Sequence, residues 1–152
     1  MSGGQTDKDQ YGDCALFTLE QQNRVACGNG IFEPAPDVTN PSLLAVGNSH
    51  YCVAEQSAGV KCFTAEEVIN LPAVVTEVPD LSNVNALVAG IDFSCAIADG
   101  KVDCWGNDYF DITSIPEGIN APESLYAERD NACVIDSQGV NCWGKNEACN
   151  AL

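Results

Sequence analysis

The chain has 152 residues, enough for one domain with a hydrophobic core, and its 22 acidic and 6 basic side chains give a formal net charge of −16 at pH 7. This charge disfavours nucleic acid and anionic membranes as partners, because both are bound through basic patches. No apolar run reaches the roughly 18 residues that span a bilayer, so we expect no membrane insertion.

The chain begins with a segment that lacks hydrophobic periodicity. We expect residues 1–11 to form a disordered tether ahead of one repeat domain at residues 12–152. The small and polar residues 2–10 are similar to the tether that follows the lipid-anchored cysteine of a lipoprotein. The sequence shows no signal peptide, so we interpret it as a mature exported form with an added Met1.

Acidic residues in this segment resemble the opening of a calcium loop. Asp7, Asp9 and Gly12 have the required order, but Thr18 stands where an EF-hand needs a bidentate acid. We therefore interpret them as part of an acidic tail. The negative charge of the whole chain serves solubility or attracts a basic partner or calcium, and the sequence leaves these alternatives open.

Four predicted β-hairpins follow along the chain, and the third shows the pattern most clearly. Its sequence from Cys95 to Cys104 is CAIADGKVDC. The pair Asp99 and Gly100 tolerates the positive φ of a two-residue turn, which places the two cysteines opposite each other. Opposite residues on antiparallel strands lie about 4.5 to 5.5 Å apart at Cα, within the range of a disulfide. We therefore predict a cross-strand disulfide.

The same arrangement recurs in all four hairpins. The predicted disulfides are Cys14–Cys27, Cys52–Cys62, Cys95–Cys104 and Cys133–Cys142. Since strand side chains alternate between faces, we expect one buried face per hairpin, on which the cysteines lie beside apolar residues. These apolar pairs are Leu16 and Val25, Ala54 and Val60, Ile97 and Val102, and Ile135 and Val140. The charged residues Arg24, Lys61, Lys101 and Asp103 fall on the opposite face.

The cysteine pattern also predicts where the protein resides. Nine cysteines, eight of them in pairs, favour an oxidising compartment: the periplasm, the outer surface or the medium. The ninth, Cys149, is either a free thiol, a cross-link between chains or a tie for the C-terminal residues. We predict no metal site and no cofactor, because no C-x-x-C spacing occurs and His50 is the only histidine.

A second motif recurs between the hairpins, with the pattern Pro, acid, two variable residues, Asn. It occupies residues 36–40, 79–83 and 116–120, and each copy precedes an apolar run that leads into the next first cysteine. Short β-prone stretches at 30–32, 74–78 and 112–115 come before each proline. We expect these stretches to supply a further strand in each unit.

The repeat length predicts the fold class. The first cysteines of the hairpins are 38, 43 and 38 residues apart, and the repeats cover about residues 12–46, 47–89, 90–127 and 128–152. A period near 40 with four short strands per unit is typical of a β-propeller, so we predict an all-β, propeller-like array of about four short blades. The longer second period reflects an insertion at 64–72, where Thr64 and Glu67 form a capping-box pattern that predicts a helical turn.

The third unit resembles the bacterial, cysteine-containing repeats of the regulator of chromosome condensation family, which have the pattern G-x-x-x-x-C-A-(hydrophobic)-x-x-D-G-x-V-x-C-W-G-x-N. The matching residues there are Gly90, Cys95, Ala96, Ile97, Asp99, Gly100, Val102, Cys104, Trp105, Gly106 and Asn107. The fourth unit matches through Cys133, Val134, Ile135, Gly139, Val140, Cys142, Trp143, Gly144 and Asn146. The first two units match in part, with Gly28 and Phe63 where tryptophan belongs.

The resemblance implies a β-propeller in which the tryptophan and glycine of each motif serve blade packing. Two features depart from the family: the Gly-Gln-Leu-Gly tail after the motif is missing, and family propellers typically close with seven blades. Four hairpins leave three ways to protect the open edges. The four blades close on themselves, two chains complete a ring, or a partner caps the ends.

The predicted function is that of a non-catalytic protein-binding module. The family often has a histidine at the position of His50, which implies a structural role, and some secreted members inhibit proteins such as β-lactamases through loops on one face. The candidate contact residues are Asp37, Asp80 and Glu117, with the aromatic residues Tyr109 and Phe110. The alternatives are an assembly subunit that oligomerises through sheet edges and a calcium-dependent adhesion or hydrolytic protein.

Overall fold

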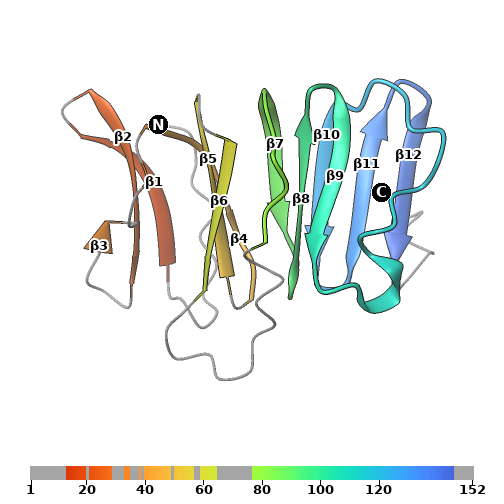
Figure 1. Cartoon of the computed structure of the whole chain (residues 1–152), viewed down its shortest axis with the longest axis horizontal. Coiled ribbons are helices and arrows are strands. Elements are labelled where there is room, and N and C mark those ends of the chain that lie inside the picture. The colour runs from red at the N-terminus through yellow and green to blue at the C-terminus, as the bar shows by residue number, and fades with distance from the viewer. Residues whose placement is uncertain are drawn as a thin grey trace.

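The fold is an all-β row of four three-stranded antiparallel sheets that follow one another in chain order (Figure 1). The computed structural model describes residues 13–19, 21–28, 33–34, 38, 40–48, 50–56, 59–64 and 77–145. Residues 1–11 and Cys149 lie outside the described residues, so the predicted tether and the role of this cysteine stay predictions.

The strands have the following bounds. Sheet 1 contains β1 (Asp13–Leu19), β2 (Gln22–Gly28) and β3 (Glu33–Pro34). Sheet 2 contains β4 (Pro41–Val46), β5 (His50–Glu55) and β6 (Gly59–Thr64). Sheet 3 contains β7 (Val84–Ala89), β8 (Phe93–Ala98) and β9 (Lys101–Gly106), and the short 3-10 helix η2 (Tyr109–Asp111) follows it. Sheet 4 contains β10 (Ser124–Glu128), β11 (Asn131–Asp136) and β12 (Gly139–Gly144).

The hairpins have the predicted register. In each sheet the two cysteines of the repeat are Cα partners. Three pairs form disulfides, with Cα separations of 4.0 to 4.1 Å: Cys52–Cys62, Cys95–Cys104 and Cys133–Cys142. The side chains of Cys14 and Cys27 lie outside the described part of the structure. In the third hairpin Asp99 and Gly100 both have positive φ, at 49° and 74°, as a type I′ turn requires.

The prediction of a fourth strand in every unit is wrong for the third connection. Residues 112–115 form turns instead of a strand. Ile112 is buried there and packs between sheets 3 and 4, so the apolar character of this stretch serves the core. Of the other two stretches, residues 30–32 and 74–76 lie outside the described residues, and residues 77–78 form no strand. Of the predicted insertion at 64–72, Thr64 is the last residue of β6, and residues 65–72 lie outside the described residues.

The prediction of one buried face per hairpin is wrong as well. Sheet 3 is buried on both sides: its cysteine face packs on sheet 4, and its opposite face, with Ala96, Ala98 and Trp105, packs on sheet 2. The cysteine face of sheet 4 is partly exposed, and Val140 on this face is 43% exposed to solvent. The reason is that sheets stacked in a row cover one another, which a single hairpin does not reveal.

Candidate functional site

The hairpin turns and the proline-acid motifs lie at the same edge of the sheets. The strands β4, β7 and β10 begin opposite the ends of β5, β8 and β11, so the segment before each of them adjoins a hairpin turn. In Figure 1 the turns from β8 to β9 and from β11 to β12 lie at the top of the molecule. We call this the turn edge, comprising residues 38, 40, 56, 79–83, 99–100, 116–120 and 136–138.

The asparagine of each motif joins its segment to the hairpin turn of the same sheet. The Asn40 side chain donates a hydrogen bond to Gln56 over 2.8 Å, and the Asn83 side chain donates to Asp99. The backbone carbonyl of Asn120 accepts a hydrogen bond of 3.1 Å from the Ser137 N–H. Asn40 and Asn83 also have positive φ, which asparagine tolerates better than most residues. The spacing of the motif reveals the repeat in the sequence. It does not reveal these hydrogen bonds, because the partner of each asparagine lies about 16 residues further along the chain.

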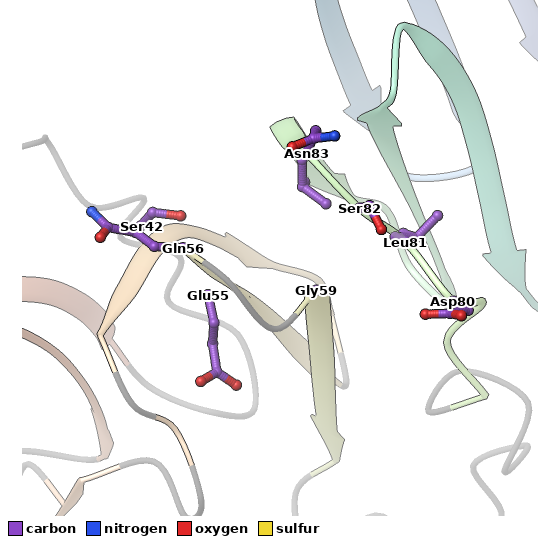
Figure 2. A pocket seen from close by; sticks show the side chains of 9 residues that line it. Ser42, Glu55, Gln56, Gly59, Asp80, Leu81, Ser82 and Asn83 are labelled. Atoms are coloured by element: carbon purple, nitrogen blue, oxygen red, sulfur yellow. The ribbon is translucent and has the colours of Figure 1, made fainter.

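A hollow of about 480 Å³ opens at the turn edge between sheets 2 and 3 (Figure 2). Its lining consists of Ser42, Glu55, Gln56, Gly59, Asp80, Leu81, Ser82, Asn83 and Val84. Gly59 has a φ of 80°, and a Cβ there would lie 2.9 Å from the Leu81 carbonyl oxygen, so a glycine allows the two sheets to approach. The Glu55 carboxylate is buried and lies 3.0 Å from Lys61 Nζ. The predicted contact residue Asp80 therefore lines a polar, acidic hollow.

The turn of sheet 4 is organised around a buried carboxylate. Asp136 accepts hydrogen bonds from the backbone N–H groups of Asn120, Gln138 and Gly139, over 2.9 to 3.0 Å. These hydrogen bonds lower the pKa of the Asp136 carboxyl below its ordinary value, and the bond from the Asn120 N–H has the largest effect. The turn edge therefore keeps a negative charge here as the pH falls toward the ordinary aspartate range. Glu117 is exposed nearby, in the same motif as Asn120.

The predicted aromatic contacts lie at the opposite edge. Tyr109 and Phe110, in η2, are 63% and 51% exposed, and η2 is at the bottom of Figure 1. The ammonium group of Lys145 lies 5.3 Å from the centre of the Phe110 ring, within the range of a cation–π contact. These aromatics therefore do not form one surface with Asp80 and Glu117. The remaining candidate, Asp37, lies outside the described residues.

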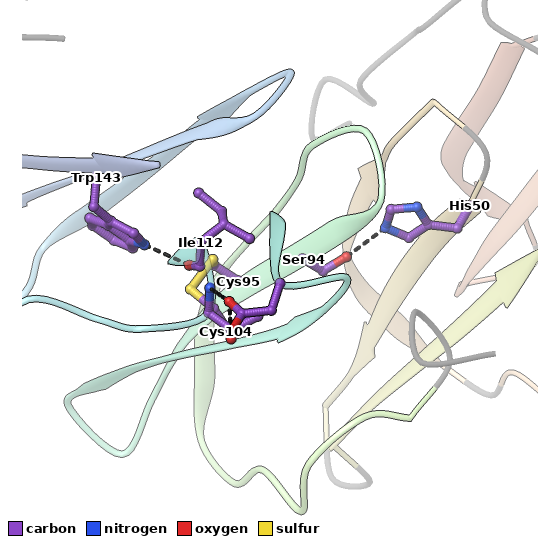
Figure 3. The surroundings of a disulfide bond; sticks show 8 residues. His50, Ser94, Cys95, Cys104, Ile112 and Trp143 are labelled. Carbon is purple, nitrogen blue, oxygen red and sulfur yellow. Dashed lines mark hydrogen bonds between the residues drawn. A yellow bond between two sulfur atoms is a disulfide. The ribbon is translucent and has the colours of Figure 1, made fainter. Parts of the chain in front are cut away.

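A buried histidine and serine join sheets 2 and 3 (Figure 3). His50 Nε2 lies 2.7 Å from Ser94 Oγ, and Ser94 Oγ lies 3.2 Å from the sulfur of Cys52. Both side chains are almost fully buried. A catalytic serine must reach a substrate, so this pair serves packing between sheets. The sequence did not indicate a role for Ser94. The residue directly before the first cysteine of the hairpin is serine here, but it is tyrosine in the preceding repeat and alanine in the following one.

His50 gives the fold a predicted pH dependence. Burial lowers the pKa of His50 below its ordinary value of 6.5, although Asp92 and the backbone of Phe93 and Ile91 oppose the shift. The unfolded chain therefore takes up a proton near pH 6.5 that the folded chain does not. We expect the free energy of unfolding to fall as the pH drops below 6.5, by at most about 1.4 kcal/mol per unit from this group.

Urea unfolding at a series of pH values between 8 and 5 measures this slope, and the His50→Gln variant is the control. The variant should have a shallower slope, because it lacks the titrating group. Equal slopes in the two proteins would contradict the assignment to His50.

The structure describes no metal centre: within the described ranges, no three side chains of His, Cys, Asp or Glu lie close enough together to hold an ion. The same residues include no helix with the length and apolar character to cross a membrane. The predicted calcium-loop residues Asp7, Asp9 and Gly12 lie outside these ranges.

Comparison with known proteins extends these observations. No family model and no curated protein sequence matches the chain. Among solved structures, the CRINKLY WD40 ectodomain of the Arabidopsis thaliana receptor kinase ACR4 matches with a TM-score of 0.63 and 25% identity, over 88% of this chain and 49% of the other. Human WBSCR16 matches with a TM-score of 0.65 and 14% identity, over 90% of this chain and 45% of the other. The structure of Kap60 bound to yeast RCC1 matches with a TM-score of 0.61 and 17% identity, over 93% and 45%.

The chain has a β-propeller-type repeat fold. The four sheets correspond to blades, each with three described strands. The propeller spans about half the length of the solved chains that it matches, and identities of 25% or less support the fold alone.

Proposed function

We propose that this propeller is a non-catalytic, exported protein-binding scaffold whose turn edge holds a basic region of a partner protein. The observation that carries the proposal is the repeated, hydrogen-bonded turn edge. It exposes Asp80 and Asp99 beside sheet 3 and Glu117 ahead of sheet 4, around the hollow between sheets 2 and 3 and the buried carboxylate of Asp136.

The disulfide-linked sheets support a binding role because they hold the turn edge in one conformation before a partner binds. Three disulfides and the bonds from Asn40, Asn83 and Asn120 restrict the turns before any partner arrives. A surface that is already ordered loses less conformational entropy on association. The net charge of −16 would also accelerate encounter with a basic partner.

The comparisons support an extracytoplasmic, protein-binding role. One match is the ectodomain of a receptor kinase, and another is a complex of RCC1 with Kap60. Disulfides persist in oxidising compartments, so the three bonded pairs favour the periplasm, the cell surface or the medium. We assign no reaction to the protein, because the buried His50 and Ser94 have no access to a substrate.

The test compares capture of proteins from the extracellular fraction of the producing cells by the full chain and by two variants. The first variant, Asp80→Asn with Asp99→Asn and Glu117→Gln, should lose the specific partner, with an affinity about tenfold to 100-fold weaker because close charge pairs are removed. Capture by the unmodified chain should also weaken as salt is added.

The matched control removes three acids from the opposite edge: Asp111→Asn, Glu128→Gln and Asp130→Asn. This variant has the same net charge as the first one and should keep the partner. Equal loss in the two variants would indicate nonspecific attraction by net charge, and equal retention would show that the turn edge is not the contact surface.

A further inference from the structure

The hollow between sheets 2 and 3 has walls that are held in place by the protein itself (Figure 2). Its volume of about 480 Å³ falls within the range of roughly 300 to 1,000 Å³ that is usual for ligand sites. The hydrogen bond from Asn40 to Gln56 restrains the wall on sheet 2, and the hydrogen bond from Asn83 to Asp99 restrains the wall ahead of sheet 3. A ligand that enters the hollow therefore requires little rearrangement of the protein.

The charge of the lining favours a cationic ligand. The charged side chains that line the hollow are Glu55 and Asp80, and none of the described residues that line it is basic. Glu55 is buried and its Oε1 lies 3.0 Å from Lys61 Nζ, so a cation of the chain itself already balances this carboxylate. Asp80 is exposed and forms no hydrogen bond or ion pair with another described residue. Its carboxylate is therefore the charged group that a ligand can reach.

The uncharged residues of the lining favour a long side chain with a polar end. Ser42, Ser82 and Asn83 carry side-chain oxygens that can accept hydrogen bonds. Leu81 belongs to the apolar core between sheets 2 and 3, and Val84 packs against this core, so both add apolar surface to the lining. A basic side chain needs both kinds of surface, because its methylene groups are apolar and its end is charged.

We propose that the hollow binds one arginine side chain from the basic region of the partner protein. This inference rests on the proposed function, which assigns a basic region of the partner to the turn edge. A guanidinium group has five N–H donors in a planar fork, so it can donate two parallel hydrogen bonds to the Asp80 carboxylate and a further one to a serine hydroxyl. A lysine ammonium group lacks this planar geometry and is more strongly hydrated, which makes it the weaker ligand.

The test is a nuclear magnetic resonance titration of the isotope-labelled full chain with three acetylated tripeptide amides. The central residue of the peptide is arginine, lysine or citrulline, which has nearly the shape of arginine without its charge. We expect the arginine peptide to shift the backbone amide signals of Gly59, Ser82 and Asn83 in a saturable manner. The lysine peptide should bind about threefold more weakly, and the citrulline peptide about tenfold or more, because it lacks the charge-assisted hydrogen bonds.

Two variants assign the binding to the hollow. Asp80→Asn removes the carboxylate, and Ser82→Leu fills the hollow without changing the net charge, so each should weaken the arginine peptide by about tenfold. Both residues are exposed, so circular dichroism should show that each variant folds. The matched control is Asp111→Asn, which removes the same charge from an exposed residue at the opposite edge and should leave the binding unchanged.

The outcomes separate this inference from the proposed function. Saturable binding of the arginine peptide that depends on Asp80 and Ser82 supports the arginine site, whatever the capture experiment shows. The arginine site is overturned if the peptide does not bind, if the lysine or citrulline peptide binds equally well, or if Asp80→Asn weakens binding no more than Asp111→Asn does. Capture of a partner through the turn edge would then leave the proposed function standing without an arginine in the hollow.

Discussion

Replacing both Cys95 and Cys104 by alanine is expected to lower the free energy of unfolding by about 2 to 4 kcal/mol. The disulfide links residues nine positions apart in the third hairpin, so its loss frees the unfolded chain to explore more conformations. Cys95 is also fully buried between sheets 3 and 4, where removal of both sulfur atoms leaves unfilled space. Urea unfolding of the oxidised protein and the variant measures the difference.

The matched control is the double variant Cys133→Ala with Cys142→Ala. This bond has the same sequence separation of nine, but its face of sheet 4 is partly exposed. Both variants lose the constraint on the unfolded chain. Cys133 is only 5% exposed, but the described residues place no neighbouring sheet on its face, so the first variant loses more packing. We therefore expect the Cys95 and Cys104 variant to be the less stable of the two. Unchanged stability in both would show that these cysteines do not form the bonds.

The parts of the fold that the sequence predicts are local. The turn at Asp99 and Gly100 determines the register of the third hairpin, and this register determines which cysteine meets which. These relations span about ten residues, and propensity and alternation are sufficient to recover them. The repeat spacing then extends the same argument to the other hairpins.

The parts that the sequence does not predict depend on contacts between sheets. Ile112 lies in a stretch that is β-prone, yet it packs into the core and accepts a hydrogen bond from a tryptophan 31 residues away. Ser94 contacts His50 across 44 residues. Strand propensity does not encode either contact, because burial in a neighbouring sheet overrides local preference. The sequence likewise did not predict the exposed face of sheet 4, because exposure depends on which neighbouring sheet covers a face.

The candidate site was predicted only in part. Asp80 and Glu117 lie at the same edge of the sheets, because each copy of the proline-acid motif precedes an equivalent strand. The motif gave no indication that its asparagine bonds the hairpin turn. The sequence prediction groups Tyr109 and Phe110 with the acids, but their position after β9 places them at the other edge.

Replacing Trp143 by alanine is expected to destabilise the protein by about 3 to 5 kcal/mol, the cost typical of removing a large aromatic side chain from a core. The Trp143 ring is buried between sheets 3 and 4, and its Nε1–H donates a hydrogen bond of 2.7 Å to the Ile112 carbonyl (Figure 3). Thermal and urea unfolding measure the loss. A change below about 1 kcal/mol would contradict the buried position of the ring.

Phenylalanine variants separate the hydrogen bond from the packing. Trp143→Phe keeps an aromatic ring but leaves the Ile112 carbonyl without its donor, which is expected to add about 1 to 3 kcal/mol to the cost of the smaller ring. Trp105 occupies the same repeat position and is equally buried, but its Nε1–H has no acceptor among the described residues. Trp105→Phe should therefore cost less than Trp143→Phe, because it removes a donor that makes no bond. Equal costs would show that the stability of the sheet 4 contact comes from ring packing alone, and that the Ile112 turn contributes nothing through its carbonyl.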